Sequence, residues 1–148
     1  MTAIKLLRGQ LRYMKDVGWE VHVMCAPGEG LAEVLSAEGA TLHEVELTRE
    51  ISPAADARAL IAAFRVLRKV RPDVTTVGTP KAGLVCGLAA ALAGVPARCY
   101  LLRGLRLETT NGVKRAMLWA AERIACSSAH VVAGVSPSLM QRARELGL

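Results

Sequence analysis

Residues 73–102 read DVTTVGTPKAGLVCGLAAALAGVPARCYLL, and this stretch decides the fold class. A β-branched run at 73–77 is followed by Thr79-Pro80, which begins an apolar helix that ends at Gly94. A second strand-like run at 98–102 comes directly afterwards. Strand, helix and strand in this order form a right-handed crossover between parallel strands. The stretch therefore predicts an α/β fold built on a parallel sheet.

The same alternation continues on both sides of this stretch. We expect further strands at 21–25, 41–47 and 131–135, and further helices before Gly18, at 31–38, between Ser52 and Pro72, at 113–127 and from Ser136 onward. Leu60, Phe64 and Leu67 mark the expected buried stripe of the helix after Ser52. The pattern predicts one Rossmann-like domain of three layers over residues 1–148, in which helices cover a mostly parallel sheet.

The usual first strand of this architecture is not visible ahead of the first helix. Ile4, Leu7, Leu11 and Met14 already recur at helical spacing. A strand missing from the middle of a sheet leaves backbone groups without partners. We therefore expect either a sheet that closes around the gap or a marginally stable, aggregation-prone protein.

The composition is that of a globular protein, with 52% apolar and 3% aromatic residues. The four cysteines, at 25, 86, 99 and 126, have no CxxC spacing, so we expect core thiols in a reducing compartment and no metal. The N-terminus is charged at once, which argues against a signal peptide. The longest apolar stretch, 82–97, is short for a membrane span and is broken by glycine and proline. The expected location is the cytoplasm, with the inner membrane surface as a peripheral alternative.

The net charge of +6 is unevenly distributed, with acidic residues gathered in 16–50 and basic residues in 58–115. A basic second half suits an anionic partner, although a solvated surface explains it equally well. Basic residues accompany apolar ones in two helices, with Lys114, Arg115 and Arg123 beside Trp119 in the second. Such helices lie on anionic lipid or pack on the sheet. Nucleic acid is not expected as a partner, because no recognition helix, aromatic platform or phosphate loop is present.

Candidate site residues follow three expected strands, at the edge where doubly wound sheets bind ligands. Thr79, Pro80 and Lys81 follow the strand at 73–77, and Lys81 lies in the first helical turn, where a cation is unfavourable unless an anion is near. The alternative for Lys81 is a side chain in solvent. Arg103, Gly104 and Glu108 follow the strand at 98–102, whereas Arg49 and Glu50 follow that at 41–47. These residues form either an anion site or a loop ion pair. Pro27-Gly28-Glu29-Gly30 predicts a plain turn, and His22, His43 and His130 are expected to be isolated and structural.

Four ordered stretches resemble a known family. They are Leu7-Arg8-Gly9-Gln10-Leu11-Arg12-Tyr13 with Gly18-Trp19-Glu20-Val21-His22-Val23, Arg49-Glu50-Ile51-Ser52-Pro53, Thr79-Pro80-Lys81-Ala82-Gly83, and Val135-Ser136-Pro137-Ser138-Leu139. Their order and spacing are similar to the N-terminal domain of bacterial family 4 glycosyltransferases, which have the GT-B fold and build capsule, exopolysaccharide or O-antigen.

The resemblance implies an acceptor-side domain that faces a separate, C-terminal domain across a cleft. It implies a lipid-linked sugar acceptor, retention of anomeric configuration, no metal or other cofactor, and a nucleotide-sugar donor held by the C-terminal domain, which these 148 residues do not include. Under this resemblance the candidate substrate-binding residues are Arg49, Glu50, Thr79, Pro80, Lys81, Arg103, Gly104, Glu108 and Ser136.

Three positions depart from the family pattern. Thr76 and Gly78 stand where the family's strand carries histidines, and Arg103 stands where its loop begins with histidine. Arginine stays protonated and is a poor base, so no catalytic residue is assigned. We expect a glycosyltransferase domain that is inactive by itself and that needs a donor domain, supplied in the same or a separate chain. The alternative is a non-catalytic module that binds anionic lipid or glycan.

Overall fold

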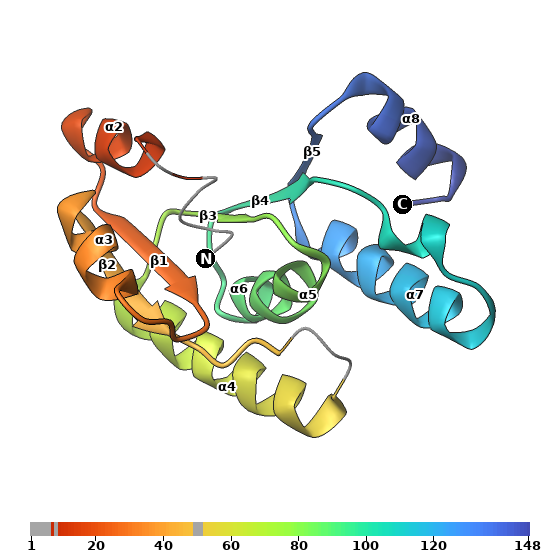
Figure 1. The fold of residues 1–148 in the computed structure, drawn as a ribbon, viewed down its shortest axis with the longest axis horizontal. Helices are drawn as coiled ribbons and strands as arrows, with labels where there is room; N and C mark the ends of the chain where they lie inside the picture. Colours follow the sequence, from red (N-terminus) through yellow and green to blue (C-terminus); the bar gives the residue numbers. More distant parts are fainter. Residues whose placement is uncertain (1–6, 8, 49–51) are drawn as a thin grey trace. The chain divides into compact units, whose positions relative to one another are not determined.

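A computed structural model describes residues 7, 9–48 and 52–148. The chain divides into two compact units, residues 1–48 and 49–148 (Figure 1). The described strands are parallel and form two sheets, one in each unit. The α/β class with parallel, Rossmann-like strand–helix alternation is confirmed. The strands pair within the first unit and within the second, and a sheet that closes around the missing strand stays a prediction.

The first unit consists of two strands and the helices that precede them. Its elements are α2 (Gln10–Asp16), β1 (Val21–Cys25), α3 (Leu31–Ala37) and β2 (Ala40–Glu44). β1 and β2 pair in parallel, with Val21 opposite Ala40. Gly39, at φ 75°, turns the chain from α3 into β2 in a conformation that favours glycine. The core consists of Leu11, Val21, Val23, Leu31, Leu35 and Ala40.

The second unit contains the three-stranded sheet, in the order β3–β4–β5. Its elements are α4 (Pro53–Val70), β3 (Val74–Val77), α5 (Pro80–Ala82), a π-helical turn (Gly83–Gly87), α6 (Leu88–Leu92), β4 (Ala97–Leu102), the 3₁₀ turn η2 (Arg106–Thr109), α7 (Gly112–Ser128), β5 (Val131–Gly134) and α8 (Pro137–Glu145). α6 contacts both α4 and α7, so the three helices form one layer (Figure 1). Parallel pairing brings the ends of the strands to one edge of the sheet.

The expected helix boundaries hold, with two differences. The buried stripe of α4 is centred on Ala59, Ala63 and Leu67, so Leu60 and Phe64 lie beside it and are only partly buried. The helix after Thr79 widens into a π turn between Gly83 and Gly87. A Cβ on Gly83 would lie 2.7 Å from the Tyr100 ring and 2.8 Å from the Ala125 Cβ. The glycine therefore lets this helix approach β4 and α7 closely, which small residues permit.

Candidate functional site

An open hollow lies where β4 and β5 end. Its lining residues are Arg103, Gly104, Glu108, Val135, Ser136, Ser138, Leu139 and Arg142. Its volume, about 410 Å³, falls within the roughly 300–1,000 Å³ that small-molecule sites occupy. The sheet's carboxyl edge thus brings together four of the candidate residues, Arg103, Gly104, Glu108 and Ser136. Parallel pairing of Leu102 with Gly134 explains this, because both loops leave the sheet at the same level.

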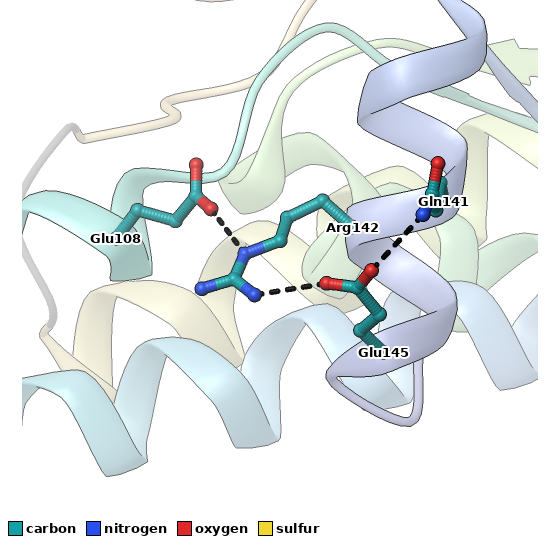
Figure 2. A network of polar contacts seen from close by, with 4 residues as sticks. All are labelled: Glu108, Gln141, Arg142 and Glu145. Carbon is teal, nitrogen blue, oxygen red and sulfur yellow. Dashed lines mark hydrogen bonds and ion pairs between the residues drawn. The ribbon is translucent and has the colours of Figure 1, made fainter.

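The carboxylates beside the hollow are paired with one arginine. Arg142 Nε donates to Glu108 Oε1 at 2.8 Å, and its Nη1 donates to Glu145 Oε2 at 2.9 Å (Figure 2). Gln141 Nε2 donates to the other oxygen of Glu145 at 3.2 Å. Arginine is charged in proteins in any environment, and these bonds raise the pKa of Arg142 further. Arg142 therefore binds both carboxylates and ties η2 to α8, and the three charged groups together keep one net negative charge.

Ser136 caps the helix that borders the hollow. Its Oγ accepts a hydrogen bond from the Leu139 backbone N–H at 3.2 Å, and Pro137 occupies the first helical position. The Ser138 hydroxyl lies 3.1 Å from the Ser136 hydroxyl. The cap predicted from Ser136-Pro137 is confirmed, and it places two hydroxyl groups on the rim of the hollow.

Thr79, Pro80 and Lys81 do not line this hollow. Thr79 Oγ1 accepts from the Ala82 N–H at 3.2 Å and so caps the helix that Pro80 begins. The Lys81 ammonium forms an ion pair with Asp56 in the first turn of α4, and less than a fifth of each side chain is exposed. Asp56 is thus an anion close to Lys81, as expected from the position of Lys81 in the first helical turn. Arg49 and Glu50 lie outside the described residues.

Comparison with known proteins supplies the family. The family model described as "Glycosyl transferase 4-like domain" matches residues 5–148. The chain belongs to this family. Capsular polysaccharide biosynthesis glycosyltransferase CapM of Staphylococcus aureus is 32% identical over 140 residues, covering 95% of this chain and 36% of the relative. The match therefore confirms the resemblance drawn from the four ordered stretches.

Two further proteins are similar to this glycosyl transferase 4-like domain. The UDP-Gal:alpha-D-GlcNAc-diphosphoundecaprenol alpha-1,3-galactosyltransferase of Escherichia coli is 27% identical over 103 residues, 68% of this chain and 27% of the relative. The crystal structure of Acinetobacter baumannii MurG superposes with a TM-score of 0.60 at 19% identity, covering 88% of this chain and 38% of MurG. This likeness concerns the fold. The domain thus spans about a third of the length of these proteins.

The sequence patterns did not identify two features of this glycosyl transferase 4-like domain. Arg142 reaches the hollow from the second turn of α8, and no local motif marks it. His22 and His43 were expected to be isolated, which is wrong: His22 Nδ1 lies 3.0 Å from His43 Nε2, and the rings stack at 5.2 Å. In the register of β1 and β2, His22 is opposite Thr41, so His43 is two residues further along β2 on the same face of the sheet, and this spacing could have revealed the contact. Within residues 7, 9–48 and 52–148, no group of three or more His, Cys, Asp or Glu side chains could hold a metal ion.

Proposed function

We propose that this chain is the acceptor-binding domain of a glycosyltransferase for cell-surface polysaccharide synthesis. The complete enzyme transfers a sugar from a nucleotide-sugar to a lipid-linked glycan. The observation that carries the proposal is the hollow at the ends of β4 and β5, lined by Arg103, Glu108 and Ser136 in a chain of this family. In parallel α/β sheets this edge is where ligands bind. The E. coli relative, whose name specifies a diphosphoundecaprenol-linked acceptor, supports the lipid-linked class of acceptor.

The groups in the hollow suit binding better than proton transfer. Arg103 is permanently charged and offers guanidinium donors to a phosphate, whereas the Ser136 and Ser138 hydroxyls can bond sugar hydroxyls. Glu108 is held by Arg142. We infer that transfer takes place only when a donor-binding domain closes on this edge, with retention of configuration and without a metal, and that the 148 residues alone bind acceptor and transfer no sugar.

The test uses the purified 148-residue chain with a polyprenol-diphosphate-linked sugar in detergent. Binding is measured by titration, and transfer by incorporation of a radiolabelled nucleotide-sugar. We expect acceptor binding without transfer. Absence of acceptor binding would contradict the acceptor role, and sugar transfer by the chain alone would contradict the need for a donor domain.

A second candidate function is a binding module for anionic lipid, located peripherally at the inner face of the membrane. The surface of α7 favours it. Val113 is 78% exposed, Met117 45% and Trp119 40%, and the neighbouring Lys114 and Arg115 are exposed cations. Trp119 is fixed by a 2.8 Å bond from its Nε1 to the Leu146 carbonyl. Apolar side chains beside cations are typical of helices that lie on anionic bilayers. No helix in the described part of the chain is long and apolar enough to cross a bilayer.

Vesicle flotation separates the two functions. If the chain is an anionic-lipid module, it floats with phosphatidylglycerol vesicles at low salt and dissociates from them at high salt. This binding needs no sugar ligand. Lys114→Glu with Arg115→Glu should abolish that flotation, whereas Arg68→Glu with Lys69→Glu, at exposed positions of α4, is the control with the same change in net charge. Flotation that is indifferent to lipid charge and to the α7 substitutions would exclude the lipid module and leave the acceptor domain.

A further inference from the structure

The Arg103 guanidinium lies over the backbone of Gly78. β3 and β4 pair in parallel, with Val77 opposite Tyr100, so the residues that follow the two strands are neighbours at the carboxyl edge. A Cβ added to Gly78 would lie 2.9 Å from Arg103 Nε and 3.6 Å from both Cζ and Nη2. Real Cβ atoms do not approach other atoms so closely, so a side chain at position 78 would displace the guanidinium. The Arg103 guanidinium thus lies in the space that a side chain at position 78 would fill.

The charge of Arg103 is not neutralised within the described part of the chain. Arg103 forms no hydrogen bond or ion pair with any described residue, although it borders a hollow that contains Glu108. The Glu108 carboxylate is bonded to Arg142, which also holds Glu145. The hollow therefore offers a guanidinium whose donors are available to a ligand, and guanidinium groups prefer phosphate or carboxylate oxygens.

We propose that Gly78 is a positioning residue for Arg103, and that the guanidinium placed over it binds the diphosphate of the acceptor. The inference rests on the proposed acceptor function and names the group that is recognised. Arg103 acts as a cation that binds charge and not as a base, because guanidinium does not lose its proton in proteins. Gly78 acts by leaving space, so its replacement moves the cation without removing it.

The substitution at Gly78 can be tested without unfolding the protein. The atom that its new Cβ meets is near the end of a flexible side chain, which can swing into solvent at little cost. Gly78→Ala should therefore leave the melting temperature almost unchanged. Gly28→Ala is the matched control, because a Cβ there meets nothing within 4 Å and Gly28 has no left-handed φ.

The probe is inorganic pyrophosphate, titrated into the intact chain at low salt by calorimetry. We expect Arg103→Gln to weaken binding about tenfold, as for the loss of one charge-assisted hydrogen-bonding partner. Arg103→Lys should retain part of the affinity, because it keeps the charge and loses the planar fork. Gly78→Ala should weaken binding at unchanged melting temperature, whereas Gly28→Ala should bind like the unsubstituted chain.

A double substitution shows whether Gly78 acts through Arg103. Gly78→Ala combined with Arg103→Gln should bind no more weakly than Arg103→Gln alone, because the group that Gly78 positions is already lost. Additive losses, full binding by Gly78→Ala, or no pyrophosphate binding by the unsubstituted chain in the millimolar range would each overturn the inference.

The source of the diphosphate is settled by two further ligands, UDP and a polyprenol-diphosphate-linked sugar. Arg103→Gln should weaken binding of the lipid-linked sugar more than that of UDP. A larger effect on UDP would assign Arg103 to the donor and overturn the inference. If the lipid-linked sugar binds the unsubstituted chain and the Arg103→Gln variant equally, the acceptor function stands and the inference about Arg103 fails.

Discussion

The Tyr100 hydroxyl donates a 2.6 Å hydrogen bond to Glu122 Oε2, and both side chains are about 1% exposed. Tyr100 is on β4 and Glu122 on α7, so the bond joins the sheet to the helix layer. The other carboxylate oxygen, Oε1, is buried and has no hydrogen-bond partner in the described part of the chain. An ionised carboxylate in such a place is costly, because burial penalises the charged form.

Burial raises the pKa of Glu122, and the bond from Tyr100 offsets only part of that rise. The folded protein therefore holds this proton more tightly than the unfolded chain does. Glu122 contributes its full stabilisation when the pH is below its pKa in the unfolded chain, about 4.3. This contribution falls as the pH rises from that value to the higher pKa in the folded protein, and it does not change further at higher pH. Glu122→Gln imitates the protonated acid, so we expect the variant to gain stability relative to the unsubstituted chain as the pH rises.

The measurement is urea unfolding of both proteins at several pH values from 4 upward. The difference between them isolates Glu122 from the other carboxylates, whose contributions cancel. A difference in unfolding free energy that does not change with pH would show that the carboxyl group has the same pKa in both states.

Gly83 permits the close contact between the helix after Thr79 and the Tyr100 ring. Gly83→Ala places a methyl group 2.7 Å from a ring carbon and 2.8 Å from the Ala125 Cβ. We expect a loss of about 1–3 kcal/mol in unfolding free energy, as for other overpacked sites. Thermal unfolding measures it, with Gly104→Ala as the matched variant, because a Cβ at Gly104 meets nothing within 4 Å. Equal stability of the two variants would mean that the helix can withdraw from β4 without cost.

Ser136 stabilises the start of α8 through its bond to the Leu139 N–H. Ser136→Ala should cost about 1 kcal/mol, the usual effect of losing an N-cap side chain. Ser127→Ala is the comparison, because the Ser127 hydroxyl only bonds back to the Ile124 carbonyl within α7. Chemical denaturation of the two variants checks the prediction, which is wrong if Ser127→Ala is the more damaging substitution.

The Lys81–Asp56 pair joins two helix N-termini, and 17% and 18% of the side chains are exposed. A pair this sheltered is screened less than a surface pair, so we expect Lys81→Met or Asp56→Asn to cost about 1–2 kcal/mol. In a double-mutant cycle the combined variant should lose less than the sum of the single losses. Strict additivity would show that the two groups do not stabilise each other.

Local patterns in the sequence determined most of the secondary structure and part of the site. Ser52-Pro53, Thr79-Pro80 and Ser136-Pro137 mark helix starts because proline at the first helical position needs no hydrogen bond from its nitrogen. Strand–helix alternation implied parallel pairing, and parallel pairing alone places the residues after β4 and β5 at one edge. Strand-end placement alone made Arg103 a candidate, whereas Ser136 was assigned to the site through the family resemblance.

Only the tertiary structure decided which charged and polar side chains pair with one another. Asp56 and Lys81, 25 positions apart in sequence, become an ion pair, whereas Arg103 stays without such a partner among the described residues. His22 meets His43, and the buried Glu122 meets Tyr100, through pairings that no local spacing encodes. The physical reason is that hydrogen bonds and ion pairs act over a few ångströms, and such distances between remote residues exist only after the strands and helices have packed.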